Sequence, residues 1–447
     1  MNPAYLEDAS GFRGHAEQFF APQDESQVLD VLRRASRDEM PVTLAGAGTG
    51  VTGGRVPLGG WVLSLEKLNR LEVRQCTAVA GPAVLLRDLH AAATRSGQFY
   101  PPDPTETAAS LGGTIATNAS GSRSFLYGDT RRHVQRLRVA LMDGRLLDVR
   151  RGDKIDFEAP ALPRPRTTKH TAGYYLAPGM DWVDLFIGSE GTLGVILEAE
   201  VSLRPAPAAV LAGVIFFPTA AGWEQLVRVP GLRMIEYFDD KSVAVLRTRY
   251  PEIPREAASA VLVEQELSGE DDPEIDRWPD RLDAAGALTD ASWFATTARD
   301  RERFRTFRHA LPEIVNDTVR RRGFMKFSSD HAVPLDRNIE MLDYYRSTLE
   351  AGFPGRYVIF GHIGDAHLHV NILPESEDDS ARARLLMIEF ARHAVALGGT
   401  VSAEHGLGKR KAHFLELQFT LSEIESMKQV KRRLDPKWLL GRGTLFQ

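Results

Sequence analysis

Three histidines and a later glutamate–histidine pair are the residues of this chain best suited to metal-assisted acid–base chemistry. His362, His367 and His369 fall within eight positions, and Glu404 directly precedes His405. Neutral imidazoles and a carboxylate suit zinc, and also manganese or iron, with coordination positions left open. Because single histidines in strands are mostly ordinary core or surface residues, spacing alone leaves a structural role as the alternative.

Two strand-like arms around Gly364-Asp365 are the elements that must position these histidines. A turn there would return His362 to the side of His369. Along the second arm, side chains of an extended strand alternate between two faces. One face then carries His367, His369 and Asn371, and the other Leu368, Val370 and Ile372. Segment 400–403 reads as a further strand, which ends at Glu404.

Three segments rich in glycine and other small residues form a second group. The first, residues 46–54, follows a predicted strand, and the others cover residues 110–121 and 185–196. Glycines let backbone amides crowd around an anion such as a pyrophosphate. The first segment is neither a Walker A motif nor a Rossmann fingerprint, and taken alone it could equally be a tight turn. Together the three segments indicate a long ligand lined by backbone.

Composition excludes several classes of protein. Among 447 residues, 55 are Lys or Arg and 60 are Asp or Glu, so no basic excess supports a nucleic-acid function. Cys76 is the single cysteine, which excludes internal disulfides, thiolate zinc fingers and an iron–sulfur cluster held by this chain alone. The N-terminus lacks the pattern of a signal peptide, and no apolar run approaches the length of a membrane span. We therefore expect a cytoplasmic protein.

Helical and strand-like patterns alternate up to a proline-containing linker at residues 203–207. Beyond the linker, strand-like runs alternate with long charged helices such as 381–397. This change predicts a first domain over residues 1–206 and a second over residues 207–447. The acidic stretch 264–276 is expected to be a solvated loop.

The three glycine-rich segments, with Lys169 and Gly173-Tyr174, resemble the FAD-binding domain of the vanillyl-alcohol oxidase/PCMH superfamily. The similarity is greatest to the branch that holds the FAD subunit of glycolate oxidase, D-lactate dehydrogenases and D-2-hydroxyglutarate dehydrogenase. The resemblance implies an α+β fold. It comprises a PCMH-type FAD-binding domain of two α/β subdomains and a C-terminal cap domain with an antiparallel sheet, whose extreme C-terminus returns to the FAD domain.

The resemblance also implies which residues bind FAD. They are Gly46, Ala47, Gly48, Thr49, Gly50, Val51, Thr52, Gly53, Gly54, Pro102, Asp103, Thr105, Gly112, Gly113, Ala116, Thr117, Asn118, Gly188, Glu190, Gly191, Gly194 and Ile196. Ala45 departs from the family, which often has arginine there. We expect FAD to be held without a covalent bond, since Cys76 is the only thiol, although a histidyl link stays open.

For the second domain, the resemblance implies metal ligands at His362, His369 and Glu404, with zinc favoured over manganese or iron. It implies a catalytic base at His405 and a carboxylate clamp at Arg308, whose guanidinium offers two parallel donors. Lys326 precedes another segment typical of the family. Position 367 departs from the family, where many members have asparagine, so His367 is either an altered substrate contact or an extra ligand.

The activity implied is an FAD-dependent dehydrogenase that oxidises a small D-2-hydroxy acid of the glycolate, D-lactate or D-2-hydroxyglutarate type. The product would be a 2-oxo acid, with the hydride passing to flavin N5 and the hydroxyl proton to His405. A quinone, a cytochrome or a partner subunit would take the electrons. A homodimer, a complex with an iron–sulfur subunit and peripheral membrane attachment stay open. The alternatives are an ether-lipid synthase of the same superfamily and a non-catalytic electron-transfer subunit.

Overall fold

The computed structural model describes residues 2–446, and its first helix shows how local pattern becomes structure. Asp24 caps α1 (Glu25–Arg37) by accepting a hydrogen bond from Gln27 N at 3.0 Å. The apolar stripe of the helix, which includes Val28 and Leu32, packs on a three-stranded parallel sheet of order β1-β3-β2. Its strands are β1 (Gln18–Phe20), β2 (Val42–Ala45) and β3 (Trp61–Ser64).

A five-stranded antiparallel sheet of order β4-β5-β9-β7-β8 forms the second part of the N-terminal half. Its strands are β4 (Leu71–Arg74), β5 (Thr77–Ala80), β7 (Val134–Ala140), β8 (Leu146–Arg150) and β9 (Val195–Ser202). Nearby helices are α2 (Leu86–Arg95), α3 (Leu111–Thr117), α4 (Ser124–Tyr127) and α5 (Trp182–Phe186). A short pair, β6 (Gln98–Phe99) with β10 (Arg204–Pro205), lies where the chain leaves this half.

A seven-stranded antiparallel sheet organises the C-terminal half, in the order β14-β11-β13-β12-β16-β17-β15. Its strands are β11 (Ala209–Phe217), β12 (Leu232–Phe238), β13 (Ser259–Leu267), β14 (Trp293–Ala295), β15 (Phe327–Ser328), β16 (Tyr357–His362) and β17 (His367–Ile372). Along β11, Leu211 and Ile215 enter one apolar core and Val214 and Phe216 another. This alternation shows that both faces of the sheet are covered.

The helices of this half divide between the two faces of the sheet. Buried residues of α6 (Trp223–Leu226), α8 (Trp278–Ala284), α10 (Asn338–Gly352) and α11 (Glu377–Ala396) join one core. Those of α7 (Asp240–Arg247) and α9 (Ala298–Arg322) join the other. The long α9 carries Arg308, and β16 and β17 carry the three histidines, so the sheet and α9 hold these side chains on one rigid support.

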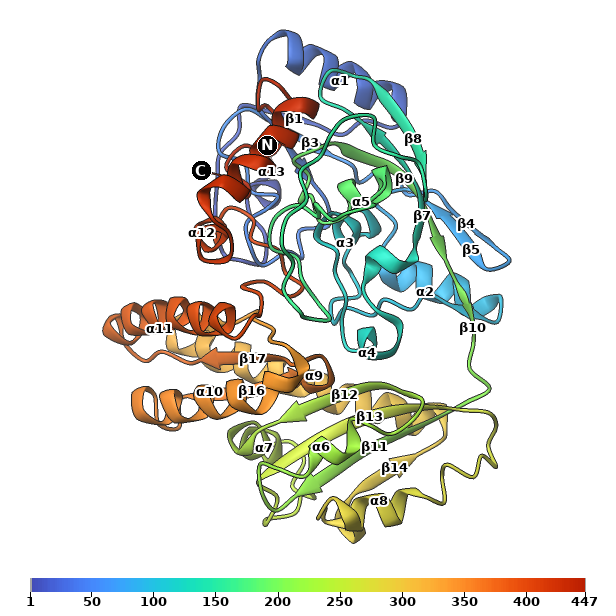
Figure 1. The fold of residues 1–447 in the computed structure, drawn as a ribbon, viewed down its shortest axis with the longest axis vertical. Coiled ribbons are helices and arrows are strands. Elements are labelled where there is room, and N and C mark those ends of the chain that lie inside the picture. The colour runs from blue at the N-terminus through green and yellow to red at the C-terminus, as the bar shows by residue number, and fades with distance from the viewer. Residues whose placement is uncertain (1, 447) are drawn as a thin grey trace.

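The C-terminal segment runs back beside the N-terminal half, and both ends of the chain lie there (Figure 1). Helices α12 (Leu415–Gln418) and α13 (Leu421–Leu434) pack in the same core as α3 and α5. Val42 N donates to Leu439 O at 2.7 Å, and Gly441 N donates to Val42 O at 2.9 Å. The division of the chain at residues 206 and 207 stays a proposal, supported by the passage from β10 to β11 at that point.

Only the beginning of the acidic stretch departs from the predicted solvated loop, because residues 264–267 belong to β13, whereas residues 268–276 form turns that are exposed or half-buried. Glu264 lies inside β13 and is only 8% exposed. Its carboxylate Oε2 accepts from Arg233 Nε at 2.7 Å and from Arg123 Nε at 3.2 Å. Two arginines from other segments therefore compensate the charge of this buried glutamate. Composition alone does not show such pairing.

Mixed helices and sheets, with an antiparallel sheet in the C-terminal half, confirm the predicted α+β class. Within residues 2–446, no helix combines the length and the apolar character needed to cross a membrane.

Candidate active site

The predicted histidine hairpin is formed by β16 and β17, with the turn between them at residues 363–366. In its register, His362 lies opposite His367 and Phe360 lies opposite His369. Leu368 and the other apolar residues of β17 enter the core beneath the sheet, as the alternation predicts. The rings of His362 and His369 have centroids 5.4 Å apart. The turn therefore does return His362 to the neighbourhood of His369.

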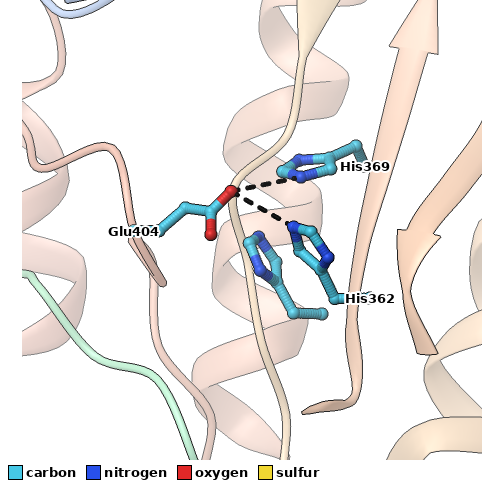
Figure 2. Close-up of side chains that lie close together, drawn as sticks. His362, His369 and Glu404 are labelled. Carbon is cyan, nitrogen blue, oxygen red and sulfur yellow. Dashed lines mark ion pairs between the residues drawn. The ribbon is translucent and has the colours of Figure 1, made fainter. Parts of the chain in front are cut away.

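Glu404 faces these histidines from a separate segment, and its two oxygens have different partners. Oε1 lies 3.4 Å from His362 Nε2 and 3.5 Å from His369 Nε2 (Figure 2). Oε2 accepts from Ser120 Oγ at 2.9 Å and from Lys169 Nζ at 3.2 Å. Burial alone would raise the pKa of Glu404, but Lys169 and His362 hold it well below its usual range. One carboxylate oxygen is thus fixed to the N-terminal half while the other faces the histidines.

The outer nitrogens of both histidines are already engaged. His362 Nδ1 lies 2.5 Å from Glu236 Oε1, and His369 Nδ1 lies 3.2 Å from the carbonyl oxygen of Ser329. Burial opposes ionisation of Glu236, but Arg308 and His362 keep its pKa below the usual range. A carboxylate or carbonyl on one ring nitrogen turns the other toward a metal, and this is the arrangement found around metal-binding histidines. The donor set fits a divalent ion.

His405 lies beside this cluster and is held by Asp330. Asp330 Oδ2 accepts from His405 N at 3.0 Å, and Asp330 Oδ1 lies 3.5 Å from His405 Nδ1. The imidazole is stacked on that of His369, with ring centroids 5.5 Å apart. Asp330 is fully buried. Burial disfavours its charge, but His405 and His367 hold its pKa well below the usual value. A charged carboxylate behind an imidazole fixes its orientation and stabilises it when it takes up a proton.

Arg308 and Lys326 contribute positive charge to the same region. Arg308 Nε donates to Glu236 Oε2 at 2.7 Å, and its Nη1 donates to Thr105 Oγ1 at 2.8 Å. In the described part of the chain, Arg308 Nη2 makes no hydrogen bond with another residue. Burial lowers the pKa of Lys326 to about 8. Both side chains line the cavity described next, so either can meet an anionic ligand there.

A single cavity of about 1900 Å³ connects the glycine-rich segments to Arg308, His369, Glu404 and His405. It also receives most of the residues predicted to bind FAD: Gly46, Ala47, Gly48, Thr49, Gly50, Val51, Thr52, Gly54, Thr105, Gly112, Gly113, Ala116, Thr117, Glu190, Gly191, Gly194 and Ile196. Five others do not line it: Gly53, Pro102, Asp103, Asn118 and Gly188. The volume exceeds the roughly 300–1,000 Å³ of a pocket for one small molecule. The cavity therefore has room for a long cofactor and a substrate together.

Close packing explains one of the glycines of this cavity. A Cβ on Gly112 would lie 2.6 Å from Pro82 Cβ, which real side chains do not tolerate. The many glycines among the lining residues leave backbone exposed to the cavity, which suits an extended pyrophosphate ligand, and these residues fit FAD. Cys76 is exposed and does not line the cavity, so it offers no covalent link there.

Two of the glycine-rich segments also hold the loop that follows His405. Glu190 accepts from Leu407 N at 2.9 Å and from Gly408 N at 2.7 Å. Thr52 O accepts from Lys409 N at 3.1 Å. Glu190 thus lines the cavity and also binds the loop that follows His405 through its carboxylate. This contact between segments more than 200 positions apart has no signal in the sequence.

Sequence reasoning assigned no role to three charged residues of the site. Glu236 and Asp330 stand behind the histidines, and Lys169, noted only as typical of the family, fixes Glu404. The only available signal is an acidic residue inside a strand, such as Glu236 in β12. A charged side chain that is buried there needs a partner of opposite charge.

Comparisons with known proteins agree with this geometry. The family "FAD linked oxidases, C-terminal domain" matches residues 210–445, and the family "FAD binding domain" matches residues 16–150. This chain belongs to the FAD-linked oxidases. It is 32% identical to a D-lactate dehydrogenase of Archaeoglobus fulgidus, across 97% of this chain and 92% of that protein. It is 29% identical to the glycolate oxidase subunit GlcD of Bacillus subtilis, across 97% of this chain and 90% of that protein.

Among solved structures, this FAD-linked oxidase resembles an alkyldihydroxyacetonephosphate synthase with a TM-score of 0.70. The two share 16% identity, over 95% of this chain and 75% of the other. At that identity the likeness concerns the fold alone, and it confirms the PCMH-type architecture.

Proposed function

We propose that this FAD-dependent oxidoreductase is a dehydrogenase of a small D-2-hydroxy acid, which it converts to the 2-oxo acid. The observation that carries the proposal is the continuity of one cavity. It runs from the three glycine-rich segments, called the FAD cradle below, to His369, Glu404, His405 and Arg308. The two curated relatives reported above are named for the oxidation of such acids, glycolate and D-lactate, which supports this substrate class.

The residues divide the work between substrate binding and proton transfer. Arg308 would hold a substrate carboxylate oxygen through Nη2, since Nε and Nη1 are engaged by Glu236 and Thr105. Lys326 would add a second positive charge. His405 would accept the proton of the substrate hydroxyl, and Asp330 would stabilise the imidazolium that results.

FAD, held by the glycine-rich segments, supplies the acceptor at N5 for the hydride that leaves the α-carbon. A divalent ion at His362, His369 and Glu404, for which we propose zinc, would polarise the hydroxyl and favour its ionisation. A quinone, a cytochrome or a partner subunit would then receive the electrons.

Anaerobic mixing of the FAD-loaded protein with glycolate and with the separate enantiomers of chiral 2-hydroxy acids tests the proposal. We expect loss of the oxidised flavin absorbance with glycolate or at least one D-enantiomer, and an equimolar 2-oxo acid that a hydrazine reagent traps. Matched L-enantiomers serve as controls. Flavin that stays oxidised with every acid would refute the proposal.

The same experiment separates the two alternatives. An ether-lipid synthase uses flavin without net redox change, so no hydroxy acid would leave its flavin reduced. An electron-transfer subunit would be reduced by a partner and not by a small acid. His369 and Glu404 line the cavity beside His405. This favours the dehydrogenase, because a subunit that only transfers electrons needs neither metal ligands nor a proton acceptor there.

A further inference from the structure

His367 is buried, and one of its two ring nitrogens has no partner within residues 2–446. Its side chain is 0% exposed. Asp330 Oδ1 lies 3.2 Å from Nε2, but Nδ1 has no hydrogen-bond partner among the described residues. A buried polar group without a partner is destabilising. A ligand of His367 would remove this cost.

The neighbours of His367 are the proposed metal ligands. Its ring centroid lies 4.5 Å from that of His369 and 5.3 Å from that of His362. One ligand atom from each of these three histidines and from Glu404 lies within 4.8 Å of the others. Donors around a tetrahedral zinc ion are about 3.4 Å apart, given bonds of about 2.1 Å. Glu404 Oε1 already lies 3.4 Å from His362 Nε2 and 3.5 Å from His369 Nε2. Side-chain shifts of at most about 1.4 Å would therefore bring all four donors onto one ion.

The position of His367 argues against contact with the substrate. His369 and Asn371, on the same face of β17, both line the cavity. His367 does not, and it lies opposite His362, which is also beneath the cavity surface. Asp330 stands next to Nε2, and a carboxylate beside one ring nitrogen is the usual support for a metal bond at the other.

We propose that this chain binds its divalent ion through three imidazoles and one carboxylate, with His367 as the fourth ligand beside His362, His369 and Glu404. This inference rests on the proposed function, which places an ion at the other three. A third imidazole favours zinc over manganese, because manganese prefers oxygen ligands. Asp330 has two roles in this arrangement, since it also supports His405.

The test compares wild-type protein with His367→Asn and with His15→Asn, which removes an exposed histidine that does not line the cavity. Each is freed of metal with a chelator and titrated with zinc and with manganese against a chromophoric competitor. We expect His367→Asn to bind zinc at least about tenfold more weakly, with a smaller change for manganese, and His15→Asn to match wild type. FAD content and the unfolding temperature monitor folding.

X-ray absorption at the zinc edge of the wild-type protein needs no variant and decides the question if His367→Asn fails to fold. Three imidazoles on zinc support the inference. Two imidazoles, or equal zinc affinity in wild type and a folded His367→Asn, overturn it while leaving the proposed function in place. If wild-type protein binds no divalent ion, both this inference and the metal-assisted reaction are wrong.

Discussion

At the flavin end of the cavity the wall is mostly backbone, drawn from segments separated by about 150 positions. At the other end the wall is made of charged and imidazole side chains, each supported by a second residue behind it. Gly112 packs directly against Pro82, whereas His362 depends on Glu236 and His405 on Asp330. Substitutions that enlarge a side chain should therefore disturb the flavin end, and substitutions that remove a side chain should disturb the other end.

The two ends are also joined. Glu404 reaches Ser120 and Lys169 with one oxygen, and Glu190 holds the loop that follows His405. The side-chain end therefore takes its position from the backbone end. Variants that affect one end and spare the other measure how far this dependence goes.

The largest effect is expected from His369→Ala at the side-chain end. Loss of this ligand should remove most of the bound metal and slow flavin reduction by at least about 10³-fold, since metal polarisation contributes several kcal/mol. FAD should remain, because the cradle is untouched. Elemental analysis, flavin absorbance and stopped-flow reduction measure these quantities, with His15→Ala, outside the cavity lining, as the matched control. Unchanged metal content in a folded, yellow variant would contradict the ligand assignment.

His405→Ala should slow the limiting rate of flavin reduction by about 10²–10⁴-fold, which is the usual contribution of a general base. Substrate affinity should change little, because Arg308 and Lys326 still hold the acid. Metal content should also stay at the wild-type value, in contrast to His369→Ala. Stopped-flow reduction at several substrate concentrations separates rate from affinity. A limiting rate equal to that of wild type would exclude His405 as the base.

How much of each end could be predicted from sequence follows from the same contrast. The glycine-rich segments and the alternation of His367, His369 and Asn371 are local patterns, and the structure places most of them on the cavity or in the hairpin. Glu236, Asp330 and the carboxylate of Glu190 act across long separations, and nothing beside them in the sequence marks their partners. Glu264 shows the same limit, because its acidic neighbours indicate a solvated loop while two distant arginines hold it in the interior.

A smaller effect is expected at the backbone end. In Gly112→Ala, the new methyl group would meet Pro82 at 2.6 Å, and overpacking of this kind costs about 1–3 kcal/mol. If the strain opposes the flavin-bound shape, FAD affinity should fall by roughly 5- to 150-fold, with metal affinity unchanged. Gly269→Ala is the control, since nothing lies within 4 Å of its added carbon. Equal FAD affinity in the two variants would show that the cradle accommodates the methyl group without weakening FAD binding.

The smallest effect concerns Lys326 and depends on pH. Burial lowers its pKa to about 8, so the ammonium is charged below pH 8 and loses its charge above it. A 2-hydroxy acid stays anionic over this whole range, because carboxyl groups ionise near pH 4. KM should therefore rise by up to about tenfold as the pH passes 8. The limiting rate of flavin reduction should depend on the protonation of other groups.

In Lys326→Arg the positive charge persists through pH 10, and KM should not change with pH. In Lys326→Met KM should be raised at pH 7 and show no further rise near pH 8. A rise in KM that survives unchanged in Lys326→Met would assign the titration to another group and leave Arg308 as the main carboxylate contact.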